Sequence, residues 1–211
     1  MIPYVIRQGD YLRKLAFTKG FDADEVWAAP ENAELKASRP NPDILCPGDI
    51  LYVPEPKAEP LPLNVGGEST YTGDVPTVTV RIIFVEGSSP LANELFAVDG
   101  LPEPFSGTTT DDGCVMFEAP ITLREASIVL PNRNLVYPVK IGDLDPSDEQ
   151  SGVATRLAHL GCYGWFAEME GDFDEDLHKL AVATFQEMIG SESTGECDDK
   201  TLSALDEKHG V

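Results

Sequence analysis

Hydrophobic and polar positions divide the 211-residue chain into three segments of different periodicity. Residues 1–55 show a strand pattern at each end and helical spacing between, while residues 75–142 show short strand patterns only. Residues 143–211 show helical spacing throughout. The pattern therefore predicts a multidomain α+β protein with a mixed, an all-β and an all-helical domain.

In the first segment, strand patterns cover residues 4–8 and 50–53, and helical patterns begin at Tyr11 and cover residues 23–35. Asp10 precedes the first helical pattern, so we expect its carboxylate to cap that helix. The order of these patterns predicts a β-α-α-β unit. The positions expected to be buried in its helices are Leu12, Leu15, Ala16, Val26, Trp27 and Ala33.

Proline and glycine mark the boundaries of the middle segment. Prolines stand at 54, 56, 60 and 62, which is typical of an extended, stiff spacer, and a glycine pair follows at 66–67. We therefore assign residues 56–74 to a linker. A Gly-Asp-Leu-Asp-Pro-Ser run at 142–147 marks the second boundary.

The middle segment is rich in β-branched residues, and Asp-Gly and Pro-Asn turns separate its strand patterns. Short strands with such turns predict an all-β sandwich. In its architecture this segment resembles immunoglobulin-like and carboxypeptidase-regulatory-like domains. The strand patterns cover residues 77–85, 94–98, 105–110, 114–118, 126–130 and 135–141.

Three helical patterns make up the last segment. The first places Val153, Leu157 and Leu160 on one face and ends at Gly161. The other two helices are expected over residues 176–188 and 200–208.

Charge is distributed unevenly along the chain, whose net charge is −22. Residues 143–211 carry 17 acidic and 4 basic side chains, a net charge of −13. Such a field repels nucleic acids and anionic membranes, and it favours solubility or a partner with a basic surface. We expect an acidic partner surface formed by Glu168, Glu170, Asp172, Asp174, Glu175 and Asp176.

Some acidic residues have the spacing of a calcium-binding loop. Asp172, Asp174 and Asp176 alternate with other residues, but Leu177 and Ala183 stand where such a loop needs Gly and Glu. Helix capping is the favoured interpretation. His159 lies near apolar neighbours and is expected to serve packing or the surface.

Reactive side chains form no recognisable catalytic set. None of the four cysteines lies in a Cys-x-x-Cys pair, and no hydrolase, zincin or phosphate-binding motif occurs. We expect no enzyme, no cofactor and no metal site. The cysteines are expected to be reduced and mostly buried, and a bridge between Cys162 and Cys197 remains open.

Two stretches at the ends of the first segment carry a family resemblance. They read YVIRQGDYL at residues 4–12 and NPDILCPGDILYVP at residues 41–54. The segment resembles a LysM domain, which implies a groove whose backbone groups bond N-acetyl amides of a glycan. The resemblance places Gly9, Asp10, Tyr11 and Leu12 on one side, called here the first wall, and Pro42, Asp43 and Ile44 on the other, the second wall. Glycan contact and a purely scaffolding role for these residues both remain open.

Four motifs in the last segment carry a second resemblance. They are Arg-Leu-x-x-Leu-Gly from 156, Gly-x-Phe-Asp from 171, Ala-Val-x-x-Phe-Gln from 181 and Thr-Gly-Glu-x-Asp-x-x-Thr-Leu-x-x-Leu from 194. The segment resembles the three-helix peptidoglycan-binding domain found beside cell-wall hydrolases.

Two functions are compatible with these resemblances. The domain order resembles accessory proteins of type VI secretion and other contractile injection systems, which implies an adaptor contacting spike, baseplate or effector components. The alternative is a protein that anchors to peptidoglycan through its first and last domains. No secretory signal and no membrane span are expected, which fits cytoplasmic synthesis and delivery to the periplasm or a target cell by an injection machine.

Overall fold

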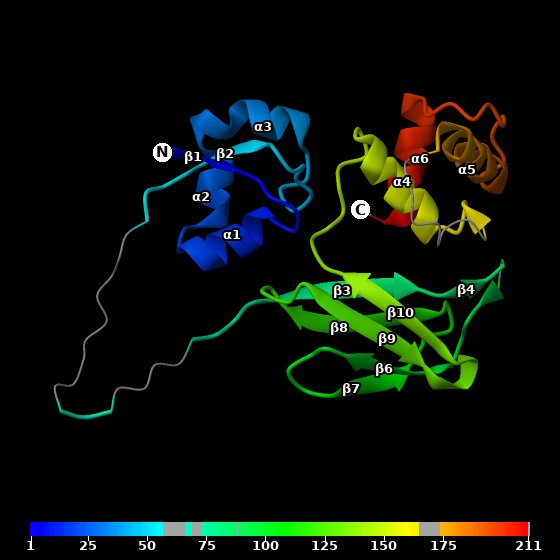
Figure 1. Ribbon diagram of the computed structural model, residues 1–211, viewed down its shortest axis with the longest axis horizontal. Helices are drawn as coiled ribbons and strands as arrows, with labels where there is room; N and C mark the ends of the chain where they lie inside the picture. The colour runs from blue at the N-terminus through cyan, green and yellow to red at the C-terminus, as the bar shows by residue number, and fades with distance from the viewer. Residues whose placement is uncertain (57–65, 69–72, 88, 165–173, 211) are drawn as a thin grey trace. The chain divides into compact units, whose positions relative to one another are not determined.

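The computed structural model shows a chain of mixed α and β structure. It describes all residues except 57–65, 69–72, 88, 165–173 and 211. Within the described residues it has six α-helices, two short 3-10 helices and several small antiparallel sheets (Figure 1). No helix in these ranges is both long and apolar enough to cross a membrane.

Two compact units make up the chain, Met1–Asp143 and Leu144–Val211. The first unit holds two separate hydrophobic cores, and the second holds one. We call residues 1–56 the N-terminal module, residues 73–143 the middle module and Leu144–Val211 the C-terminal unit.

In the N-terminal module, a two-stranded antiparallel sheet packs with short helices (Figure 1). The strands pair from Ile2 opposite Val53 to Val5 opposite Ile50. The predicted inner face of the first helix is confirmed, because Leu12, Leu15 and Ala16 are buried. The elements are β1 (Ile2–Val5), α1 (Leu12–Lys19), α2 (Ala23–Ala28), the 3-10 helix η1 (Pro30–Asn32), α3 (Ala33–Ser38) and β2 (Ile50–Val53).

The predicted single helix over 23–35 is wrong, since α2 ends at Ala28 and η1 begins at Pro30. A proline disfavours helical backbone in the residue before it, and Ala29 is extended, with φ −64° and ψ 138°. Of the side chains expected inside, Val26 is buried and Trp27 partly buried, whereas Ala33 is exposed.

Asn32, which is fully buried, connects the interruption between α2 and η1 to the sheet. Its amide donates to the backbone oxygens of Val26, at 2.8 Å, and Tyr52, at 2.9 Å. Its Oδ1 accepts from the N–H of Tyr52 at 2.7 Å. The two short helices are thus fixed against β2 by one satisfied polar side chain.

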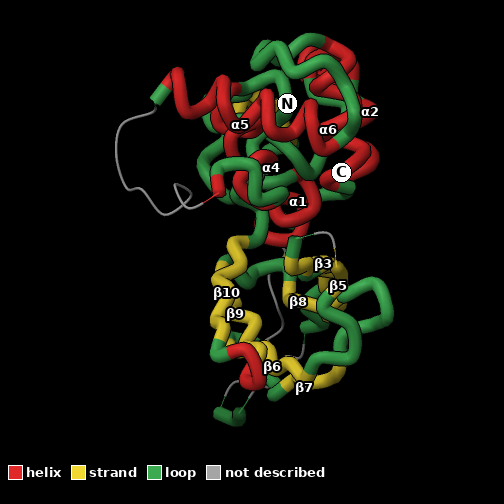
Figure 2. The backbone as a smooth tube through the Cα atoms, turned by 90° about the vertical axis from the view of Figure 1, so that its right-hand side faces the viewer, coloured by secondary structure: helices red, strands yellow, loops and turns green. Residues whose placement is uncertain are grey.

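Strands and turns dominate the middle module, and its strands are yellow in Figure 2. One sheet has the order β10-β9-β6-β7, another pairs β3 with β8, and a third pairs β4 with β5. Each of the six predicted strand patterns contains a strand, while the short β5 was not predicted. The elements are β3 (Thr77–Ile83), β4 (Val85–Glu86), β5 (Ser89–Pro90), β6 (Leu95–Asp99), β7 (Phe105–Thr108), β8 (Cys114–Pro120), β9 (Glu125–Leu130), the 3-10 helix η2 (Pro131–Arg133) and β10 (Leu135–Lys140).

The two larger sheets share one hydrophobic core. Alternate residues of β8 enter it, and so do alternate residues of β9, as strand geometry requires of a sheet with one buried face. The buried residues of these two strands are Val115, Phe117, Ala119, Ala126, Ile128 and Leu130.

The C-terminal unit contains α4 (Gln150–His159), α5 (Glu175–Met188) and α6 (Asp199–His209). These helices agree with the predicted ones to within a residue or two at each end. Their shared core is formed by Val153, Leu157, Cys162, Ala181, Val182, Phe185 and Leu205.

A buried glutamine organises the connection between α5 and α6. Gln186 is 2% exposed, and its Oε1 accepts from the N–H groups of Thr194, at 2.8 Å, and Gly195, at 2.9 Å. Its Nε2 donates to the backbone oxygen of Glu196 at 3.0 Å and to Oγ1 of Thr201 at 3.1 Å. The hydrogen-bonding capacity of its side chain is used within the chain itself, which identifies Gln186 as a structural residue.

Candidate functional site

The two walls of the predicted groove come together in the structure, although about 30 residues separate them along the chain. The first wall lies between β1 and α1, and the second lies between α3 and β2. The N–H of Leu12 donates to the backbone oxygen of Pro42 at 3.1 Å. One backbone hydrogen bond therefore joins the walls directly.

The second wall is a turn held by polar contacts. Nε of Arg13 lies 2.6 Å from Oδ2 of Asp43, and the N–H of Asp43 donates to Oδ1 of Asn41 at 3.0 Å. Pro42, Asp43 and Ile44 are each partly exposed. Their side chains are consequently accessible from outside while the backbone beneath them is fixed.

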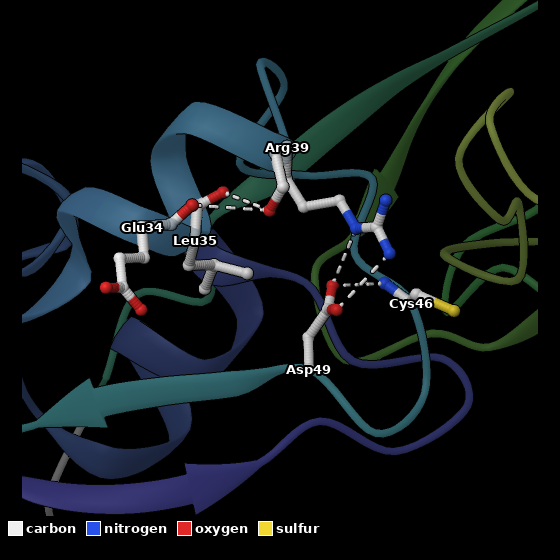
Figure 3. A network of polar contacts seen from close by, with 6 residues as sticks. Glu34, Leu35, Arg39, Cys46 and Asp49 are labelled. Atoms are coloured by element: carbon white, nitrogen blue, oxygen red, sulfur yellow. Dashed lines mark hydrogen bonds and ion pairs between the residues drawn. The ribbon is translucent and has the colours of Figure 1, made fainter.

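A largely buried ion pair closes the loop that carries the second wall (Figure 3). Nε of Arg39 lies 2.9 Å from Oδ2 of Asp49, and Nη2 lies 3.3 Å from Oδ1, so the pair is bidentate. The same Oδ2 accepts from the N–H of Cys46 at 2.9 Å. Arg39 is only 7% exposed. Because Arg39 and Asp49 lie at the two ends of the loop, their contact restrains both ends.

Asp10 of the first wall is used inside the module. Its Oδ2 accepts from the hydroxyl of Tyr4 at 2.8 Å and from the N–H of Arg7 at 3.1 Å. The prediction that Asp10 caps the first helix is wrong, because the residue at the cap position is Tyr11, whose side chain makes no capping bond. The carboxylate instead closes the turn that leads out of β1, and the pKa of Tyr4 is raised by burial and by Asp10.

The aromatic side chain of the first wall points into protein. Tyr11 is 3% exposed, and its hydroxyl donates to the backbone oxygen of Ile121 in the middle module at 3.0 Å. Burial, followed by the nearby carboxylate of Asp43, raises the pKa of Tyr11. Leu12 is 2% exposed and belongs to the core of the N-terminal module.

Gly9 also lies against the middle module. Its φ of +78° favours glycine, and a Cβ added there would lie 2.7 Å from Nη2 of Arg124 and 3.1 Å from Oδ1 of Asp143. That Nη2 donates to the backbone oxygen of Gln8 at 2.8 Å. Among the seven groove residues, the apolar side chains that reach solvent belong to the second wall, and they are those of Pro42 and Ile44.

Sequence reasoning did not find Arg39, Asn32 or the burial of Tyr11. The Tyr11 contact joins positions 110 residues apart, and no local pattern encodes it. The one signal was a tyrosine directly before a helix, where small polar residues are preferred. A buried tyrosine with a hydrogen-bonded hydroxyl fits that position.

The predicted acidic surface is described only in part. Glu168, Glu170 and Asp172 lie outside the described residues, whereas Asp174, Glu175 and Asp176 are exposed at the start of α5. Oδ1 of Asp174 accepts from the N–H groups of Asp176 and Leu177, each at 3.0 Å, so the capping prediction is confirmed for Asp174. Glu175 lies 3.0 Å from Nζ of Lys179.

His159 and His209, at the ends of α4 and α6, contact each other, whereas the two cysteines of the C-terminal unit differ in burial, with Cys162 buried and Cys197 exposed. Nδ1 of His159 and Nε2 of His209 are 2.9 Å apart, with their rings stacked. Burial lowers the pKa of both, to about 4 for His209. Cys162 and Cys197 are free thiols, and burial raises the pKa of Cys162 to about 11.

Among the described residues, no group of three or more His, Cys, Asp or Glu side chains is placed to hold a metal ion. Comparison with protein-family models, with curated proteins and with solved structures gives no match for this chain.

Proposed function

We propose that the protein is a non-catalytic adaptor that binds a component of a contractile injection system, such as a type VI secretion or phage-tail-like machine. The component would be a spike, baseplate or effector protein. In this proposal the N-terminal module is a LysM-like domain, the middle module an immunoglobulin-like sandwich and the C-terminal unit a peptidoglycan-binding-like domain. The resemblances in the sequence motivate these assignments, and no enzymatic step is proposed.

One observation carries the proposal: the second wall is fixed in shape and exposed at the same time. The Arg39–Asp49 pair and the Arg13–Asp43 pair restrain the loop from two sides. A surface that is already ordered loses little conformational entropy when a partner binds. The partly exposed Pro42 and Ile44 supply the apolar area that such a contact needs.

The first wall supports a protein partner over a glycan. Its aromatic side chain is already bonded to a protein backbone oxygen, that of Ile121. The LysM-like loops are thus engaged with protein in this very chain. A basic partner surface would also complement the net charge of −22 and the exposed Glu175 and Asp176.

Peptidoglycan binding is the second candidate function. The exposed apolar groups of Pro42 and Ile44 flank a turn, and apolar side chains of this size can pack on sugar faces. This use of the second wall is compatible with an adaptor that also has wall affinity.

Ile44→Ala tests both candidates, with Ile50→Ala as the matched control. Ile50 is also an isoleucine of the N-terminal module, but it is 50% exposed on β2, outside the second wall. Losing an anchoring side chain typically weakens binding by about 1–3 kcal/mol. Pull-down of tail and spike components from a native lysate and co-sedimentation with purified sacculi are run in parallel on both variants.

We expect Ile44→Ala to reduce capture of an injection-system component and Ile50→Ala to leave it unchanged. Loss of sacculus binding alone would select the peptidoglycan function. Equal behaviour of the two variants in both assays would reject the second wall as the binding surface. Release of soluble muropeptides by the pure protein would contradict the non-catalytic part of the proposal.

A further inference from the structure

We propose that the middle module covers the first wall in the resting protein, and that a glycan chain using both walls must displace it. The inference rests on the second candidate function, peptidoglycan binding, because it concerns access of a glycan to the LysM-like groove. It assigns a regulatory role to the contact between Gly9–Tyr11 and the segments 121–124 and 142–143.

Tyr11 is the anchor of this contact. Its hydroxyl bond to the backbone oxygen of Ile121 is buried, and a Cβ added at Gly142 would lie 2.7 Å from Cδ1 of the Tyr11 ring. The ring therefore sits where only a glycine is tolerated beside it. A sugar that stacked on this ring would occupy the space that Gly142 and Ile121 now fill.

Polar contacts at the rim close the rest of the first wall. Nη2 of Arg124 donates to the backbone oxygen of Gln8, and Nε2 of Gln8 donates to that of Asp143 at 3.2 Å. The oxygen of Gly9 accepts from Nζ of Lys14. The backbone oxygen of Gly9, which could accept from an N-acetyl amide, is thus already engaged within the chain.

Several features make the contact reversible. It has one buried hydrogen bond, whereas the bonds of Gln8 with Arg124 and Asp143 are exposed, so that water can replace either partner when the contact opens. The contact also places two cations, Lys14 and Arg124, near each other. The pKa of Lys14 is lowered first by burial and then by the positive charge of Arg124. A Pro- and Gly-rich linker at 56–74 gives the modules a covalent tether, which favours reclosing after each opening.

Arg124→Ala opens the contact without altering a groove residue, and Arg124 is exposed, so its loss should leave the fold intact. Gly142→Ala is the second variant, since its methyl group would push against Tyr11. Arg81→Ala is the matched control, because Arg81 is an arginine of the same module whose side chain is 58% exposed and approaches Asp112 at 3.7 Å.

Two measurements are made on the full chain. Amide hydrogen exchange over residues 8–12 reports whether the wall is covered, and calorimetric titration with chitotetraose, a β-1,4-linked N-acetylglucosamine tetramer, reports access. Removing one charged hydrogen bond should shift the closed–open balance about fivefold to tenfold. We expect Arg124→Ala and Gly142→Ala to exchange faster over residues 8–12 and to bind chitotetraose tighter by that factor, with Arg81→Ala matching wild type.

Unchanged exchange in both variants would show that no reversible contact exists. Faster exchange without a gain in chitotetraose affinity, or no binding by any variant, would also overturn the proposed masking. None of these results tests the role of the second wall. That role is tested separately by Ile44→Ala in the pull-down and sacculus assays. Loss of the proposed function would appear there and leave the exchange data unaffected.

Discussion

Each compact unit contains a buried arginine paired with an aspartate, and the two pairs differ in what they join. Arg39 and Asp49 are ten residues apart, and their bidentate contact closes a single loop. Arg156 is 2% exposed, and its Nε lies 2.9 Å from Oδ1 of Asp206, fifty residues further along the chain. The first pair is a local restraint, while the second connects α4 to α6.

The Arg156 contact also reaches the beginning of the unit. Its Nη1 donates to the backbone oxygens of Asp145, at 2.8 Å, and Gly152, at 2.9 Å. The approach of Nε to Asp206 is an ion pair whose alignment does not make a regular hydrogen bond. Similar residues therefore stabilise a whole unit in one case and shape a surface loop in the other.

The largest expected effect is that of Arg156→Leu. It removes the donors to two backbone oxygens and leaves Asp206 without its cation. Breaking a buried pair typically costs about 3–5 kcal/mol, and the 34% exposure of the Asp206 side chain places the expected loss near the lower value, about 3 kcal/mol. Urea denaturation of the full chain followed by helical circular dichroism measures it, with Asp206→Asn completing a double-mutant cycle. A loss below about 1 kcal/mol would mean that this pair is no more important than a surface one.

Arg39→Leu should destabilise less, by about 2 kcal/mol, because Asp49 keeps the hydrogen bond from the N–H of Cys46 and the lost contact restrains a single loop. Hydrogen exchange should quicken over residues 41–46 and stay slow in the C-terminal unit. Arg13→Leu is the control, since its 58% exposed side chain pairs with Asp43 at the surface and should contribute about 0.5 kcal/mol or less. Equal effects of the two substitutions would contradict the distinction between a buried and an exposed pair.

The C-terminal unit should also respond to acid through the stacked histidines. The pKa of His209 is lowered from 6.5 to about 4 by burial, then by His159 and Arg156. The unfolded chain takes up this proton near its ordinary pKa, whereas the folded chain resists it. Stability that is present above the unfolded pKa is therefore lost as the pH falls from 6.5 towards about 4.

Discounting for partial exposure of the ring, we expect wild type to lose about 1.5 kcal/mol more than His209→Gln between about pH 7.5 and pH 4.5. Urea midpoints at intermediate pH values measure the difference. Parallel pH profiles of the two proteins would show that His209 does not sense acid.

The smallest effect concerns the exposed carboxylates of α5. Asp174→Ala should destabilise the C-terminal unit by about 1 kcal/mol, because two N–H groups lose their acceptor. Asp176→Ala, which removes a neighbouring charge from the same first turn, should change stability by about 0.3–0.5 kcal/mol. Thermal or urea unfolding of both variants separates the effect of the capping hydrogen bonds from the effect of negative charge near the helix start. Equal losses of stability in the two variants would assign the effect to charge alone.

Local sequence determined most of the secondary structure. Runs of β-branched residues bounded by turns marked the strands of the middle module. Apolar spacing marked α5 and α6, because burying one face of a helix requires that period. The sequence also determined that residues before β2 return to the start of α1, as the paired β1 and β2 demand. Apolar spacing on both sides of Pro30 favoured a continuous helix, although a proline disfavours helical backbone in the residue before it.

Only the tertiary structure decided which surfaces remain free. Tyr11 is covered by a segment that lies 110 positions further along the chain. Arg39 and Arg156 pair with aspartates to which no short sequence motif connects them. Gln186 likewise looks like an ordinary helical residue until the loop before α6 folds over it. Periodicity states which face of an element is apolar, but the exposure of a polar or aromatic side chain depends on which distant segment packs against it. Which segment packs there depends on the free energy of forming the complete hydrophobic core, and each local pattern contributes only a part of that free energy.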